Sequence, residues 1–197
     1  MRFRACIAVA FVAAIGLAAS SAVATEQVTV GNAKVIVKTV TGAFEGEMRE
    51  LHLLDDVYHN ELIETAEESA TQLVFLDDTA ITLGPKSRIV LDRFVYDPDP
   101  SKAAFVMTAT QGVFRFASGK LPKAAYQIHT PAATIGIRGT VLQISVLSLA
   151  SPAGGLQVAV EVLVDSGEAE LVTRDGAKLH VAAGDPPARV TTTFVSP

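Results

Sequence analysis

Short runs of strand-forming residues, each bounded by turn residues, recur along this chain and restrict it to an all-β fold. The pattern is clearest between residues 71 and 94, where runs over 72–76, 79–83 and 88–94 are separated by Asp77-Asp78 and by a Gly-Pro-Lys-Ser turn at 84–87. Two strands around a two-residue turn, followed by a third strand, are typical of an antiparallel meander. Many short strands without intervening helices indicate an all-β architecture rather than a βαβ one.

The same pattern predicts further strands on both sides of the meander. They are expected over 28–30, 34–40, 104–109, 113–117, 125–129, 140–147, 156–164, 169–173 and 178–182. Gly31-Asn32 predicts a hairpin turn between the first two of these. Residues 47–69 predict a strand, a loop and a second strand, and the two prolines within 96–102 predict an exposed loop. Residues 186–197 begin with Pro186-Pro187 and predict an extended tail.

The N-terminus has the charge order of a cleavable export signal. Arg2 and Arg4 precede an apolar run over 5–19, which at 15 residues is shorter than the roughly 20 that a membrane-spanning helix requires. The small residues at 20–24 that follow predict cleavage after Ala24. An uncleaved signal anchor is the alternative. With cleavage, residues 1–24 are a signal peptide and the mature protein is periplasmic or secreted.

Charge and cysteine content exclude several classes of function for the mature chain. Removing residues 1–24 takes away two of the 16 Lys and Arg and none of the 21 Asp and Glu, which lowers the net charge from −5 to −7. Nucleic acid is therefore not an expected partner. The one cysteine, Cys6, lies in the predicted signal, so no disulfide or thiolate site is expected. The later apolar runs have only strand length, and no membrane-spanning segment is expected after cleavage.

Several local motifs together resemble the FecR family of bacterial cell-surface signalling. They are Asn-Glu-Leu-Ile-Glu-Thr at 60–65, the turns at 76–79 and 84–87, a Gly167-Glu168 pair, and above all Thr-Pro-Ala-Ala-Thr-Ile-Gly-Ile-Arg-Gly-Thr at 130–140. The resemblance covers roughly residues 55–185, preceded by an N-terminal β segment at 25–54. It implies a solenoid-like or elongated sandwich of short consecutive strands. It also implies a sensing module that works through protein contacts.

Two features depart from the family pattern. The family usually has Asp-Gly where this chain has Asp77-Asp78, so we expect one aspartate to tolerate a positive φ, or a change of turn type. FecR-type regulators also carry a cytoplasmic anti-sigma segment and a transmembrane helix before this domain, whereas here a cleavable signal is expected directly before it. Direct sigma-factor control is therefore not carried over to this chain.

The motif at 130–140 holds the candidate binding residues, which are Thr130, Pro131, Gly136, Arg138, Gly139 and Thr140. Glycine within a strand marks a bulge or a close backbone approach, and Arg138 lies between two such glycines. Two interpretations of Arg138 remain open. Its guanidinium either satisfies an internal carboxylate or strand-end carbonyls, or it faces an anionic ligand or acidic partner segment together with Lys120 and Lys123.

No catalytic or metal-binding motif is present in the sequence. The four histidines are dispersed, and there is no nucleophile elbow, phosphate-binding glycine loop or zinc-protease motif. We therefore predict a non-enzymatic module without cofactor or metal, which binds or senses an envelope protein such as a transporter or membrane sensor. The alternative is a structural envelope protein that binds peptidoglycan or another glycan.

Overall fold

The computed structural model describes residues 27–97, 99, 101–151 and 155–194, and these residues form 16 β-strands and one short 3₁₀-helix. The all-β prediction is confirmed. No helix within these ranges is long and apolar enough to cross a membrane. The elements are β1 (Thr29–Val37), β2 (Val40–Phe44), β3 (Glu47–Glu50), β4 (Asp56–Tyr58), β5 (Leu62–Thr65), β6 (Ala70–Phe75), β7 (Ala80–Leu83), β8 (Arg88–Val95), β9 (Ala104–Ala117), η1 (Lys123–Ala125), β10 (Tyr126–His129), β11 (Ala133–Ile137), β12 (Val141–Ala150), β13 (Leu156–Ser166), β14 (Glu168–Thr173), β15 (Lys178–Ala182) and β16 (Ala188–Phe194).

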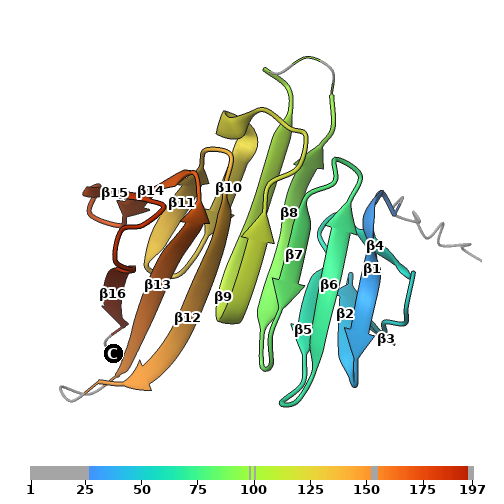
Figure 1. Ribbon diagram of the computed structural model, residues 1–197. Helices are drawn as coiled ribbons and strands as arrows, with labels where there is room; N and C mark the ends of the chain where they lie inside the picture. The colour runs from blue at the N-terminus through green and yellow to red at the C-terminus, as the bar shows by residue number, and fades with distance from the viewer. Residues whose placement is uncertain (1–26, 98, 100, 152–154, 195–197) are drawn as a thin grey trace, which may run out of the picture.

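The strands form one open sheet that folds into two layers sharing the long strand β9. One layer has the order β4-β1-β6-β7-β9-β12-β13-β16 and the other β3-β2-β5-β8-β9-β10-β11-β14-β15. All pairs are antiparallel except β9 with β10, which is parallel. In Figure 1 the chain advances across the molecule from β1–β4 (blue) to β13–β16 (red), which gives the elongated two-layered body expected from the sequence.

Gly112 lets β9 pass from one layer to the other. Residues up to Gln111 pair with β8 and β10, whereas Gly112 and the residues after it pair with β12 and β7. Gly112 has a φ of 110°, and a Cβ there would lie 2.1 Å from the Oγ of Ser87. Only glycine combines this conformation with so close an approach to the β7–β8 turn.

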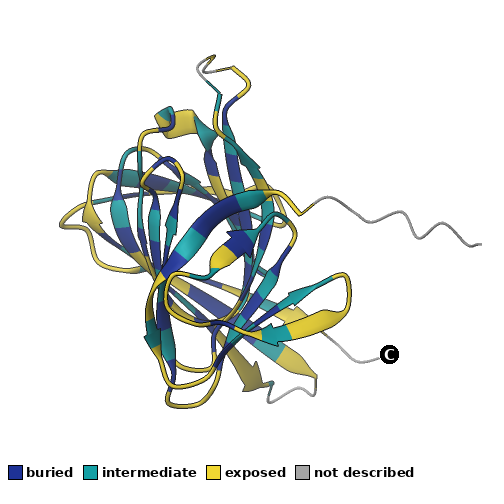
Figure 2. Ribbon diagram, turned by 90° about the vertical axis from the view of Figure 1, so that its right-hand side faces the viewer, coloured by how far each residue is buried: buried dark blue, intermediate teal, exposed yellow. Residues whose placement is uncertain are grey.

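An aromatic cluster fills the space between the two layers. Phe105, from the half of β9 that pairs with β8 and β10, has its ring centroid 4.9 Å from Phe75 and 5.7 Å from Phe116, and both of these partners come from the other layer. Tyr126 and Phe94 complete the cluster. In Figure 2 buried segments (dark blue) alternate with more exposed ones along the strands, as expected when one face of each layer packs against the core.

Two local predictions are wrong. Gly31-Asn32 is not a hairpin turn, because β1 continues through it. A Cβ on Gly31 would lie 2.4 Å from the carbonyl oxygen of Val74 on β6, so this glycine serves a close approach between strands. The stretch predicted as an extended tail contains β16, which pairs with β13 and buries Val190. The predicted signal peptide, its cleavage site and residues 195–197 lie outside the described ranges.

The stretch 47–69 is strand and loop as predicted, but it holds three strands, β3, β4 and β5, where two were expected. Two other local predictions are confirmed. The described residues of 96–102 lie in the connection between β8 and β9. Asp78 has a φ of 67°, so the turn after β6 does use an aspartate in the left-handed region. These predictions depended on turn chemistry, which is local to the sequence.

Candidate functional site

The motif at 130–140 begins with a tight turn between β10 and β11. The Thr130 hydroxyl accepts a hydrogen bond from the Ala133 N–H at 3.0 Å and donates to the Ala133 carbonyl at 2.6 Å. A threonine that binds the backbone three residues ahead closes such a turn locally. Thr130 and Pro131, both half-buried, therefore set the start of β11.

The other end of the motif is tied to the start of β14. The backbone N–H of Arg138 donates to the Glu168 carbonyl at 3.1 Å, and the Thr140 hydroxyl donates to the same carbonyl at 3.0 Å. The Thr140 N–H donates to Ser118 Oγ at 3.0 Å. Thr140 is 3% exposed. It is a structural residue that holds the crossover from β11 to β12, and it is not available to a ligand.

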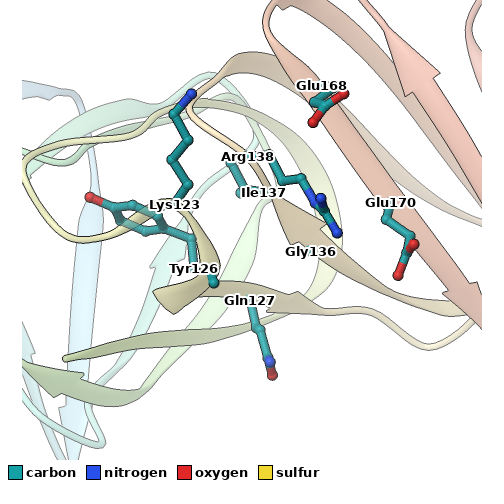
Figure 3. Close-up of a pocket in the computed structure, with 9 residues that line it drawn as sticks. Lys123, Tyr126, Gln127, Gly136, Ile137, Arg138, Glu168 and Glu170 are labelled. Carbon is teal, nitrogen blue, oxygen red and sulfur yellow. The ribbon is translucent and has the colours of Figure 1, made fainter. Parts of the chain in front are cut away.

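Between these ends, Gly136 lies at the centre of a surface groove of about 550 Å³. Gly136 is directly opposite Gln127 on β10 and Glu170 on β14. At this position the central strand, β11, therefore has no side chain, whereas both neighbouring strands have one. Figure 3 shows Lys123, Gln127, Arg138, Glu168 and Glu170 arranged around the groove, while the ring of Tyr126 points away from it.

Two cations in this groove have no ionic partner among the residues that the structure describes. Arg138 is exposed, and its guanidinium makes no hydrogen bond or ion pair with any residue that the structure describes. Within the described ranges the structure therefore gives the guanidinium no internal acceptor. The end of the Lys123 side chain lies over Gly139, where a Cβ would be 2.6 Å from Lys123 Cε, and Lys123 likewise has no ion pair within the described ranges.

The remaining charges near the groove are paired. Lys120, expected beside Arg138, instead binds Asp78 at 2.5 Å, and this ion pair raises the pKa of Lys120. Glu168 lies 3.2 Å from His180, and Glu170 lies 3.2 Å from Lys178. The groove thus has two cations without an ion pair among the described residues and, along β14, Glu170 paired with Lys178 and Glu168 beside His180.

Thr130 and Pro131 lie apart from this groove, at the opposite end of β11. They line a second hollow of about 330 Å³ together with Arg174 and Phe194. The guanidinium carbon of Arg174 lies 5.3 Å from the centre of the Phe194 ring, a cation–π contact. Of the six candidate residues, the structure brings Gly136 and Arg138 together at the first groove, and Gly139 lies under the side chain of Lys123, which also lines it.

Three groove residues were not predicted from the sequence, namely Gln127, Glu168 and Glu170. The period-2 pattern of β14 places Glu168 and Glu170 on one face, and this signal was readable. Their position beside Gly136 depends on the pairing of β11 with β14, which joins residues more than 30 positions apart.

Two carboxylates are buried elsewhere, and both have structural partners. Asp77 accepts hydrogen bonds from the Thr79 hydroxyl at 2.6 Å and from the Tyr126 hydroxyl at 2.8 Å. Burial, with a smaller effect of the Asp77 carboxylate, raises the pKa of Tyr126 to about 12. Glu61 accepts from Arg49 Nε at 2.9 Å, and burial raises the pKa of Glu61 although Arg49 opposes this.

The described residues contain no group of three His, Cys, Asp or Glu side chains that could hold a metal ion. The chemistry that the groove around Gly136 offers is recognition of charged groups by a guanidinium, an ammonium, an amide and two carboxylates.

The FecR protein family model matches residues 61–163 of the chain. The chain belongs to the FecR family. This match extends from the residue before β5 into β13 and includes Lys123, Gly136 and Arg138, whereas Glu168 and Glu170 lie beyond it. The resemblance seen in the motifs is confirmed, and membership of the FecR family supports a regulatory role in signalling.

Comparison with curated proteins finds no match for this FecR chain. Two crystal structures of a protein proposed to be an anti-sigma factor from Parabacteroides distasonis are similar to it. They have 13% and 12% sequence identity and TM-scores of 0.47 and 0.46, and each alignment covers 67% of this chain. The chain spans about half (54%) of the length of those structures.

Proposed function

We propose that this FecR chain is a non-enzymatic module of the bacterial envelope that acts in signalling by binding another protein, such as a transporter or a membrane sensor. FecR-family membership supports the signalling part of this proposal. The export signal predicted over residues 1–24 supports a periplasmic location. The structural support is an open strand edge suited to an extended partner segment.

The edge of β16 is the observation on which this proposal depends. An unpaired strand edge can accept a partner strand through main-chain hydrogen bonds. Four strands have only one neighbour among the described strands, and they are β3, β4, β15 and β16. Strand β4 has only three residues, three of the four residues of β3 are charged, and β15 has five residues that include Lys178 and His180. Strand β16 has seven residues with the sequence Ala-Arg-Val-Thr-Thr-Thr-Phe, so its edge is the least protected.

Alternate residues of β16 turn their backbone groups toward the free edge. The Gly84 N–H donates to the Val113 carbonyl at 2.8 Å. From Val113 onward, the backbone N–H and C=O groups of odd-numbered β9 residues therefore point to β7, and those of even-numbered residues point to β12. The same alternation can be followed through the registers of β9 with β12, β12 with β13 and β13 with β16. It directs the backbone N–H and C=O of Val190 toward β13. Thr191 then presents its N–H and C=O to the edge.

Site-specific crosslinking tests this edge. A photo-reactive residue at position 191 should crosslink one envelope protein in living cells, and the same residue at exposed Glu45 should not. Thr191→Pro removes the edge N–H while leaving the β13 pairing in place, so it should abolish binding of the protein so identified. Thr191→Val keeps the N–H and is the matched control. Equal binding by both variants would refute strand addition at β16.

Location and the glycan alternative are tested separately. Mass spectrometry of the periplasmic fraction should find a chain that begins at Thr25, and a chain found only in the cytoplasm would overturn the proposal. Purified sacculi should not sediment the protein. Sedimentation with sacculi, combined with no protein crosslink under several growth conditions, would favour the structural alternative.

A further inference from the structure

We propose that the groove around Gly136, here called the motif groove, binds the side-chain carboxylate of an acidic residue in an extended segment of a protein partner. Arg138 would bind the carboxylate, and the face of β10, β11 and β14 would hold the segment. The inference rests on the proposed protein-binding function and names a second contact surface, distinct from the β16 edge.

The groove exists because Gly136 has no side chain, and the backbone does not require a glycine there. Gly136 is absent from the glycines of positive φ. A Cβ at this position would meet only the Glu170 carbonyl oxygen, at 3.7 Å, which is ordinary van der Waals contact. Gly112 is different, since it needs both its φ and its close approach to Ser87. The absence of a side chain at Gly136 therefore has one structural effect, which is to leave the groove open.

The Arg138 guanidinium, which has no ion pair with a described residue, matches a carboxylate. A guanidinium offers parallel N–H donors that fit the two oxygens of a carboxylate. The Lys123 side chain crosses Gly139 and extends away from the guanidinium in Figure 3, so Arg138 is the group that would meet the carboxylate. Figure 3 shows the guanidinium extending over β11 toward Glu170.

The carboxylates of the groove favour a peptide over a polyanion. Glu168 and Glu170 form the wall opposite Gln127, and they would repel a phosphate group, a nucleic acid or an anionic lipid surface. A peptide carries N–H donors beside its acidic side chain, so it can satisfy the guanidinium and the carboxylate oxygens together. The groove volume of about 550 Å³ accommodates a short peptide segment rather than a whole protein surface.

A matched pair of peptides tests the inference. The probes are a blocked pentapeptide, Thr-Val-Glu-Val-Thr with acetylated N-terminus and amidated C-terminus, and the same peptide with Gln in place of Glu. Titration into isotope-labelled full-length mature protein should give saturable shifts of the backbone amide signals of Gly136, Arg138 and Gly139. The Gln peptide should bind about tenfold more weakly, because it has no negative charge to pair with the Arg138 guanidinium.

Three variants locate the binding. Arg138→Ala should weaken the Glu peptide about tenfold, and Gly136→Val should weaken it at least as much by filling the groove. Arg189→Ala is the control, because Arg189 is an exposed arginine on β16, in the other layer, that makes no ion pair with a described residue. Equal affinities for the Glu and Gln peptides, or unchanged binding by Arg138→Ala and Gly136→Val, would overturn the inference.

The same measurement is repeated with other anionic ligands. Inorganic phosphate, vesicles of phosphatidylglycerol and purified sacculi should each produce weaker shifts at Gly136 than the Glu peptide, or none. Tighter binding of any of these in an Arg138-dependent manner would assign the groove to that ligand and overturn the peptide assignment.

The inference and the proposed function fail in different ways. If a partner crosslinks at position 191 but the Glu peptide does not bind, protein binding stands and the motif groove is not its contact. If the peptide binds through Arg138 but no envelope protein crosslinks at position 191, the groove is a carboxylate site and strand addition at β16 is refuted.

Discussion

The hydroxyl of Tyr126 donates a hydrogen bond to the Asp77 carboxylate across 2.8 Å, in the interior of the protein, where neither residue is more than 1% exposed. The same hydroxyl accepts a hydrogen bond from the Leu121 N–H at 3.0 Å. Asp77 belongs to the turn after β6, whereas Tyr126 begins β10, so this contact joins the two layers. A buried carboxylate needs such donors, because it has lost its hydration.

Replacing Tyr126 with Phe should lower the free energy of unfolding by about 1–3 kcal/mol. The ring still fills the core, but the buried Asp77 carboxylate loses one of its two hydroxyl donors and the Leu121 N–H loses its acceptor. Urea denaturation followed by circular dichroism measures the effect. Tyr96→Phe is the matched control, since Tyr96 is 55% exposed, and it should change stability by less than about 0.5 kcal/mol. Equal effects of the two substitutions would contradict the buried network.

Stability should also fall at alkaline pH because of Tyr126. Burial raises its pKa from 10.0 to about 12. Between these two values the unfolded chain loses the phenol proton while the folded chain keeps it, so the unfolded state is favoured as pH rises. The contribution is fully present below pH 10 and is lost through about pH 12. The difference in melting temperature between wild type and Tyr126→Phe should shrink across this window, and parallel curves would contradict the assignment.

Removing Arg49 should destabilise the protein by about 3 kcal/mol at neutral pH. Its guanidinium donates from Nε and Nη2 to the fully buried carboxylate of Glu61, at 2.9 and 3.2 Å. Arg49→Ala leaves that carboxylate buried without its cation. Thermal denaturation of the variant measures the loss, and Arg93→Ala, which removes an exposed arginine, is the control with an expected change under about 0.5 kcal/mol.

The effect of Arg49→Ala should depend on pH. Burial already raises the pKa of Glu61 above 4.5, and loss of Arg49 should raise this pKa further. Because the pKa of Glu61 is raised in the folded state, folding favours the protonated carboxyl group. Its contribution to the free energy of unfolding is therefore present at low pH and is lost as pH rises through the folded pKa. The deficit of Arg49→Ala is therefore expected to be smaller at pH 4 than at pH 7. A deficit independent of pH would mean that Glu61 is not charged at neutral pH.

Local turn chemistry made much of the fold predictable from sequence. The meander of β6, β7 and β8 was readable because two turns of distinct composition separate its strands, and the positive φ of Asp78 followed from the same reasoning. Strand β16 was missed because two prolines and three threonines resemble a loose end. Only its pairing with β13, across about 30 residues of chain, identifies it as part of the sheet.

The site was only partly predictable for a similar reason. The motif at 130–140 drew attention to Gly136 and Arg138, but a motif does not show which strand lies beside it. The approach of Glu168 and Glu170 depends on β14 pairing with β11, and the path of β9 through both layers depends on one glycine. Sequence periodicity reports which face a residue occupies, whereas strand order depends on contacts distant in sequence.

Two glycine substitutions should have opposite effects on stability. Gly136→Val should leave the free energy of unfolding unchanged or raise it by up to about 1 kcal/mol, because a β-branched residue suits a strand and the Cβ has room. Gly112→Val should lower it by about 3 kcal/mol or more, since the φ of 110° and the approach to Ser87 exclude a side chain. Urea denaturation of both variants measures the difference. A strongly destabilised Gly136→Val would mean that this glycine serves the backbone, and the groove could not then be its structural purpose.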